Sequence, residues 1–286
     1  MVPDFTIVTA SYNYGHYIRE CLESVAGQEG VSLEHLIYDG ESTDDTADIV
    51  AEFPHVTFVQ EPDKGMSHAI NKGFSNAKGR WVMWLNTDDR LKPGALKAVL
   101  DFAKGKDDSD VIYGGWDFID KEGGFIRAMT VFPFQKSMLC YLGCYIGSTS
   151  TFYRNSTVIS KGLHLDETFK FIMDGEYYNR LASLGKKITY MHAVLADFRI
   201  HGMNLSFRNK DCSNASEQLV LEKQYAESSA IRRAYGWKRV TKFPWVWFVD
   251  GFLYGYYQLK KFVLKRLYRK LVPMIEIPSN SNLDRL

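Results

Sequence analysis

Four short apolar runs alternate with helical hydrophobic patterns through the first ninety residues of the chain. Parallel neighbouring strands need crossover connections, and strands that are covered on both faces read as continuous apolar runs. The pattern therefore predicts an α/β fold whose central sheet is mostly parallel and carries helices on both faces. The predicted strands are residues 5–10, 33–38, 56–60 and 80–85, and the predicted helices are residues 18–25, 46–53 and 66–77.

Polar residues follow three of these strands, at residues 9–13, 39–44 and 86–89. The carboxyl ends of parallel strands meet at one edge of a sheet, which is where open α/β folds bind ligands. Asp88 and Asp89 are adjacent carboxylates that repel each other, and a divalent cation with oxygen ligands would neutralise them and hold a diphosphate. The alternative is a polar turn in which one of the two aspartates caps a helix that begins near Pro93.

Four segments, in this order along the chain, resemble the family 2 glycosyltransferases, which use the nucleotide-diphospho-sugar transferase fold known as GT-A. They are Thr9-Ala10-Ser11-Tyr12-Asn13, residues 39–46, Asp63-Lys64-Gly65 with residues 69–73, and residues 85–89. The resemblance is close over residues 4–115 and looser as far as residue 202. It implies a GT-A fold with a nucleotide-sugar-binding subdomain at 1–110, an acceptor-binding and catalytic-base subdomain at 111–210 and a helical C-terminal extension at 211–286.

The resemblance also implies a donor site. In this family the first loop and the residue that matches Asp39 hold the nucleoside, while the carboxylates that match Asp88 and Asp89 hold the ribose and the metal on the diphosphate. Mn²⁺ or Mg²⁺ is the expected cofactor. His68 stands where many relatives carry an acidic residue, and it is left out of the site. The expected nucleotide-binding residues are Thr9, Ser11, Asn13, Asp39 and Asp88, and the expected metal ligands are Asp88, Asp89 and His201.

A second acidic segment, residues 171–184, reads as an amphipathic helix that Gly185 ends. It resembles the segment that carries the general base in this family, with Asp174 in the base position. A sugar hydroxyl is a poor nucleophile, so a carboxylate within hydrogen-bond reach must take its proton. Met173 departs from the second acid that relatives often carry. The alternative role for Asp174 is the N-cap of this helix.

Two further groups of residues have supporting roles by resemblance. Glu176 and Arg180 follow Asp174 in register, and we expect them, together with Arg199, on the acceptor side. Arg199-Ile200-His201 follows a strand predicted to run through residues 194–196, and it is similar to the Arg-x-His segment that closes many active sites of the family. A histidine there can approach a metal or a diphosphate. The Gln-x-x-Arg-Trp signature of processive polysaccharide synthases is absent from the sequence, which favours addition of single residues.

The C-terminal region is basic and aromatic. Eleven Lys or Arg side chains and one acid, Asp250, lie between Arg232 and Lys270, whereas the whole chain has a formal net charge of +1. The apolar run at residues 243–257 is too interrupted to span a membrane, but aromatic residues flanked by cations suit a helix in the headgroup layer of an anionic leaflet. The alternative is packing of the aromatic side chains on the catalytic domain or on a second subunit. No nucleic-acid-binding module accompanies the charge, so nucleic acid is not expected as a partner.

Together these features predict an inverting, metal-dependent glycosyltransferase. It would move a sugar from a nucleoside-diphosphate sugar, with UDP favoured over GDP or TDP, to a saccharide or lipid-linked saccharide in surface polysaccharide or O-antigen assembly. With scattered cysteines and no recognisable signal peptide, we expect a cytoplasmic protein held peripherally at the inner face of the membrane. Two other enzyme classes share parts of this fold. A Rossmann dehydrogenase would carry Gly-x-Gly-x-x-Gly after the first strand, and a sugar nucleotidyltransferase would carry a Gly-rich loop with a following basic residue after residues 5–10, but the sequence has neither motif. The alternative function is a non-catalytic sugar-nucleotide or glycan binder at the membrane surface.

Overall fold

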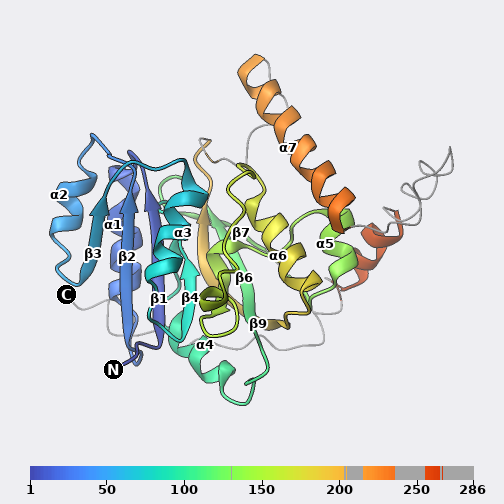
Figure 1. Cartoon of the computed structure of the whole chain (residues 1–286), viewed down its shortest axis with the longest axis horizontal. Helices are drawn as coiled ribbons and strands as arrows, with labels where there is room; N and C mark the ends of the chain where they lie inside the picture. The colour runs from blue at the N-terminus through green and yellow to red at the C-terminus, as the bar shows by residue number, and fades with distance from the viewer. Residues whose placement is uncertain (130, 203, 205–214, 236–254, 265, 267–286) are drawn as a thin grey trace.

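The computed structural model describes residues 1–129, 131–202, 204, 215–235, 255–264 and 266. Strands and helices alternate through its first half as the sequence predicts (Figure 1). The elements are β1 (Phe5–Ser11), α1 (Gly15–Ala26), β2 (Leu33–Asp39), α2 (Thr46–Ala51), β3 (Val56–Gln60), α3 (Met66–Asn76) and β4 (Trp81–Trp84).

The sheet is parallel in its first half and mixed in its second. Its order is β3-β2-β1-β4-β8-β6-β9-β5, with β7 paired to β6, and the four strands of the first half pair in parallel. Strand β8 lies antiparallel between β4 and β6, so the expectation of a mostly parallel sheet holds only for the first half. The sheet is continuous across the predicted boundary at residue 110. The added strands are β5 (Arg90–Leu91), β6 (Val111–Ile119), β7 (Phe125–Met129), β8 (Thr151–Arg154) and β9 (Ile188–Arg199).

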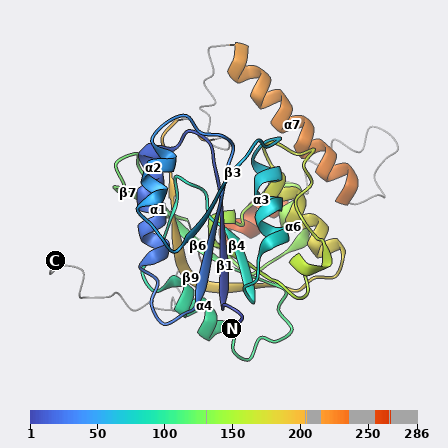
Figure 2. The same ribbon diagram turned by 60° about the vertical axis from the view of Figure 1, so that its left-hand side comes forward.

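Both faces of the sheet are covered, as the continuous apolar runs require. Along β4, Val82 and Trp84 pack into a core cluster with side chains of α3 and α6 (Met173–Ser183). Trp81 and Met83 point the other way, into a cluster with α1 and α4 (Ala95–Ala103). Successive side chains of a strand point to opposite faces, so an apolar strand needs a hydrophobic layer on each side. Figure 2 shows α1 and α3 on the two sides of the sheet.

The start of α4 decides one of the alternatives raised by the sequence. Its N-cap is Gly94, which adopts a left-handed conformation with φ of 73°, and neither Asp88 nor Asp89 caps it. Neither aspartate is therefore the N-cap of this helix, and that alternative is wrong.

Helices α5 (Lys136–Leu142) and α7 (Ala215–Tyr235) lie against α6, and α7 extends beyond the body of the molecule (Figure 1). Tyr257 of a further helical segment, residues 255–264, packs into the core cluster that includes side chains of α6. Two short 3₁₀ turns, Ser148–Ser150 and Ile159–Lys161, flank β8. Most of the aromatic run predicted at 243–257, and residues 267–286, lie outside the described residues. Within the described part of the chain, no helix is long and apolar enough to cross a membrane.

Candidate functional site

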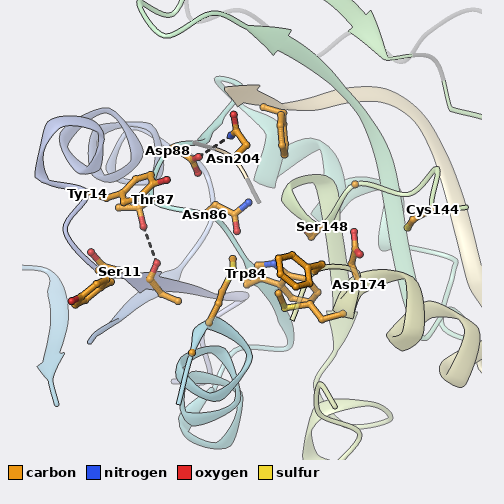
Figure 3. Close-up of a pocket in the computed structure, with 18 of the residues that line it drawn as sticks. Ser11, Tyr14, Trp84, Asn86, Thr87, Asp88, Cys144, Ser148, Asp174 and Asn204 are labelled. Atoms are coloured by element: carbon orange, nitrogen blue, oxygen red, sulfur yellow. Dashed lines mark hydrogen bonds between the residues drawn. The ribbon is translucent and has the colours of Figure 1, made fainter. Parts of the chain in front are cut away.

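One cavity of about 490 Å³ lies at the carboxyl ends of β1 and β4, and it is lined by both halves of the chain. Ser11 and Tyr14 come from the β1–α1 segment, Asp88 follows β4, and Asp174 lies on α6. In Figure 3, Ser11 and Tyr14 lie on one side and Asp174 on the opposite side, with Asn86 between them. The fold therefore brings Asp88 and Asp174, which the sequence assigned to different steps, to a single cavity.

The loops after β1 and β2 are tied to each other. Asp39 is 1% exposed, and it accepts hydrogen bonds from the amide and hydroxyl of Ser42 at 2.7 and 2.6 Å. Asn13 adopts a left-handed backbone conformation, with φ of 54°, and its side-chain oxygen accepts a hydrogen bond from the Thr43 amide at 2.9 Å. Asparagine tolerates this conformation better than most residues. Asp39 and Asn13 thus set the shape of the two loops beside the cavity.

The other two predicted residues of the first loop differ in position. Thr9 is fully buried, and its hydroxyl lies 2.9 Å from Nε2 of His35 on the neighbouring strand. Ser11 lines the cavity, and its buried hydroxyl has no hydrogen-bond partner within the described residues. A buried hydroxyl without a partner is costly, so Ser11 is a candidate for a ligand contact and Thr9 for sheet packing.

Asp88 and Asn204 line one corner of the cavity, and His201, which does not itself line the cavity, contacts Asp88 there. The Oδ2 of Asp88 lies 2.8 Å from Nε2 of His201 and accepts a hydrogen bond from the side-chain amide of Asn204 at 3.3 Å. Asn204 also accepts a hydrogen bond from the His201 backbone amide at 3.0 Å, which fixes the turn. A carboxylate, an imidazole and an amide therefore converge at one point. Sequence reasoning missed Asn204, although it lies in the same turn as His201.

Asp89 does not line the cavity. It is 1% exposed, and its two oxygens accept hydrogen bonds from the backbone amide of Arg199 at 3.0 Å and from the side chain of Asn86 at 2.9 Å. Burial raises the pKa of Asp89, and the neighbouring charge of Asp88 raises it further. The structure thus points the two adjacent carboxylates in different directions, and Asp89 joins the β4 loop to β9.

Arg199 is fully buried beneath this corner. Its Nε donates a hydrogen bond to the Asp88 carbonyl at 2.9 Å, and its remaining donors reach Glu20 on α1 at 2.6 Å and the Lys121 carbonyl at 3.0 Å. The predicted acceptor-side role is not supported by this position, because the guanidinium holds the backbone of Asp88 from behind.

Tyr14 and Asn86 line the cavity and were not selected from the sequence. Burial raises the pKa of Tyr14 to about 12, with a smaller contribution from the charge of Asp88. The phenol is therefore protonated at neutral pH and can donate a hydrogen bond. The side-chain oxygen of Asn86 is buried without a partner among the described residues. Its place next to Thr87-Asp88 was the signal that could have found it.

Asp174 is the second residue of α6, whose N-cap is Ile172, so the alternative role as N-cap is wrong. The carboxylate accepts a hydrogen bond from the Gly175 amide at 2.7 Å and lines the cavity beside Cys144. Burial, which outweighs the effect of that hydrogen bond, raises the pKa of Asp174 to about 6. A carboxylate with this pKa is ionised at neutral pH and is a stronger base than an ordinary aspartate.

Glu176 and Arg180 lie on another side of α6 and form a pair of their own. Arg180 donates to both oxygens of Glu176 at 2.8 and 3.1 Å, and the hydroxyl of Tyr235 on α7 donates to Glu176 at 2.7 Å. Neither residue lines the cavity. Their contacts join α6 to α7 and do not support a direct acceptor-side role.

The sequence matches the family described as Glycosyl transferase family 2 over residues 6–167, which is more than half of the chain. Chondroitin synthase of Escherichia coli is 25% identical over 84% of this chain, but the chain spans only 37% of that protein. Similar solved structures include residues 1–349 of TarS from S. aureus in complex with UDP-GlcNAc, with a TM-score of 0.62 and 17% identity over 94% of this chain and 76% of that one. Another is the mannosyltransferase PcManGT from Pyrobaculum calidifontis in complex with GDP-Man and Mn²⁺, with a TM-score of 0.56 and 14% identity over 91% and 74% of the two chains. Because the sequence identities are low, the structural similarity establishes the fold alone, which is GT-A.

Proposed function

The chain belongs to glycosyl transferase family 2, and we propose on this premise that it transfers a sugar from a nucleoside-diphosphate sugar to a saccharide acceptor. The observation that carries the proposal is that Asp88 and the carboxylate of Asp174 line one cavity. A diphosphate site and a general base must face the same anomeric carbon for a direct transfer, and a shared cavity supports this arrangement.

The Asp88 corner suits a divalent cation bound to a diphosphate. Asp88 and His201 carry ligand types that Mn²⁺ and Mg²⁺ accept, and such ions usually take their remaining ligands from water and substrate phosphates. The described residues contain no cluster of three or more His, Cys, Asp or Glu side chains that could hold a metal by themselves. A shared site that the donor completes is consistent with both observations. When bound, the cation would neutralise the charge of the departing nucleoside diphosphate.

Asp174 is the proposed general base. Its ionised carboxylate would accept the proton of an acceptor hydroxyl as that oxygen attacks the anomeric carbon from the side opposite the diphosphate. A single displacement of this kind inverts the anomeric configuration. The protonated phenol of Tyr14 and the hydroxyl of Ser11 would donate hydrogen bonds to the donor, and Arg199 would keep the backbone of Asp88 in place.

The donor and acceptor classes follow from the same proposal. UDP is the favoured nucleotide, with GDP or TDP as alternatives, and the similar structures contain UDP-GlcNAc in one case and GDP-Man in another. We propose a saccharide or lipid-linked saccharide acceptor in the assembly of a surface polysaccharide such as an O-antigen.

Turnover of nucleotide sugars tests the proposed function directly. We expect the protein to hydrolyse or transfer radiolabelled sugar from one nucleotide class, in a reaction that requires Mn²⁺ or Mg²⁺ and stops with a chelator. The measurement is release of nucleoside diphosphate from UDP-, GDP- and TDP-linked sugars with and without the ion. Binding without turnover would favour the non-catalytic sugar-nucleotide binder, and no binding by the folded protein would contradict both functions.

Peripheral attachment to the membrane is a second part of the proposal. In the helical segment 255–264, the side chains of Tyr256, Leu259, Phe262 and Val263 are between 45 and 65% exposed. Tyr257 is 8% exposed and packs into the core instead. An exposed apolar stripe beside Lys260 and Lys261 suits a helix that lies in the headgroup layer of the cytoplasmic leaflet.

Sedimentation with vesicles measures this attachment. We expect the protein to sediment with vesicles of phosphatidylcholine and phosphatidylglycerol more than with phosphatidylcholine alone. Replacing Leu259 and Phe262 together by Glu should weaken vesicle binding by about tenfold or more, because each apolar side chain contributes about 1.5–3 kcal/mol when it is fully buried. Phe125→Glu, at an exposed aromatic residue of β7, is the control and should bind normally. Equal sedimentation of all variants would contradict the membrane proposal.

A further inference from the structure

Glu227 of α7 binds the segment that leads into α6. Its carboxylate accepts three hydrogen bonds from successive backbone amides, those of Lys170 at 2.8 Å, Phe171 at 3.1 Å and Ile172 at 3.0 Å. Hydrogen bonds to an ionised carboxylate are stronger than those between neutral groups, and an anion is favoured at the N-terminus of a helix. More than fifty residues separate donor and acceptor, so this contact depends on the docking of α7.

The bound segment forms part of the cavity wall. Phe171, Met173 and Asp174 all line it. At the other end of the segment, Lys170 donates a hydrogen bond through Nζ to the Lys64 carbonyl at 3.0 Å, next to Gly65 of the cavity wall. Residues 170–174 therefore run from the loop before α3 to the proposed base.

The helix that carries the base does not fix this segment by itself. Ile172 is its N-cap, and it makes no side-chain capping hydrogen bond within the described part of the chain. The carboxylate of Asp174 already accepts the Gly175 amide. The amides that precede the helix are satisfied from α7 instead.

Glu227 belongs to one face of α7 that follows α6 over two turns. Ile231 is 6% exposed, and its Cδ1 lies 3.8 Å from the position that a β-carbon on Gly175 would occupy. One turn further along α7, the hydroxyl of Tyr235 donates a hydrogen bond to Glu176 of α6. Residues spaced by four lie on one side of a helix, so Glu227, Ile231 and Tyr235 form a single contact surface.

We propose that Glu227 is a positioning residue for the transfer reaction, and that its three amide contacts fix the segment 170–174 so that Asp174 faces the acceptor hydroxyl. Glu227 does not line the cavity, and we expect it to make no contact with a substrate. The inference rests on the proposed function, because it assigns Asp174 the part of the base. It makes the helical extension a working part of the catalytic site.

Glu227→Gln is the variant that tests the inference. The glutamine amide nitrogen is a donor, so it opposes a backbone donor and at least one of the three contacts is lost while the size of the side chain is kept. We expect kcat to fall about 10- to 100-fold, the range that small displacements of a catalytic group cause, with donor KM and metal-dependent nucleotide binding unchanged. Glu222→Gln, the same change at an exposed position of α7, is the matched control and should keep wild-type kcat.

Two further readouts separate positioning from loss of fold. In hydrogen exchange, the amides of residues 170–172 should exchange faster in Glu227→Gln, while those of β1 and β4 keep their protection. In a double-mutant cycle, Glu227→Gln should add little to the loss caused by Asp174→Asn, because a residue that acts through another is not additive with it. Multiplicative losses, a wild-type kcat in Glu227→Gln or unchanged exchange at 170–172 would each overturn the inference. If Asp174→Asn itself kept full turnover, the proposed function would fail instead, and hydrogen exchange would still report on the Glu227 contacts.

Discussion

Asp174→Asn is expected to lower the rate of sugar transfer by about 10²- to 10⁴-fold, the usual contribution of a general base. Asparagine keeps the size of the side chain and can still accept the Gly175 amide, but it cannot take a proton from an acceptor hydroxyl. Ser11 and Tyr14, which we propose to contact the donor, lie on the opposite side of the cavity, so donor binding should not change (Figure 3). The measurement is kcat under saturating donor, together with calorimetric binding of nucleoside diphosphate. Near-normal turnover in this variant would remove Asp174 from the mechanism.

The pH profile of the wild-type protein should show the titration of the same carboxylate. Because burial raises the pKa of Asp174 to about 6, the ionised fraction falls as the pH drops through 6. The rate should therefore decline about tenfold per pH unit below that point, and it should be nearly constant between pH 7 and 8. Nucleotide binding followed at each pH separates loss of the base from loss of the donor. An acid limb near pH 4 would contradict the raised pKa.

Asp88→Asn is the second change with a large expected effect. The change removes the negative charge of the carboxylate that contacts His201 and Asn204. Arg199 continues to hold the backbone carbonyl of residue 88. A cation on a diphosphate supplies several kcal/mol of charge stabilisation, so its loss should lower turnover by at least about 10²-fold.

Calorimetry of UDP, GDP, CDP and TDP, each with and without Mn²⁺, measures the predicted loss of metal-dependent nucleotide binding. Wild type should show one nucleotide whose affinity rises with the ion, and Asp88→Asn should lose that rise. Asp101→Asn, an aspartate that pairs with Lys97 and Lys104 on the surface, should behave as wild type. If Asp88→Asn kept the full metal effect, the ion would have to bind elsewhere.

The first half of the fold was predictable because its elements carry their own local signals. Apolar runs such as residues 80–85 have the length and flanks of strands, and the helices between them have clear apolar faces. The second half has weaker signals. Strand β8 is four residues long and lies between β4 and β6, two strands that are distant from it in sequence. Such pairing is decided by tertiary contacts that periodicity does not record.

For the site, the sequence indicated which residues are involved but not how their side chains are oriented. The sequence identified Asp88, His201 and Asp174, and the structure brings all three to the cavity or its corner. The sequence did not indicate that Asp89 points into the protein, because the direction of neighbouring side chains in a loop depends on the backbone path. The contacts of Glu227 could not be predicted from the sequence either, because they join α7 to the segment before α6 and such packing has no sequence pattern.

The corner around Asp88 is assembled from residues that are far apart in the sequence. The strands that form the first half of the sheet end at residue 84, but His201 and Asn204, which contact Asp88, are more than a hundred residues further along. Arg199, which holds the Asp88 backbone from beneath, is also translated late. The sheet is continuous from β3 to β5, so these late residues belong to the same folding unit as the first four strands. A chain that ended before β9 would lack Arg199, His201 and Asn204, and it could not form the Asp88 corner.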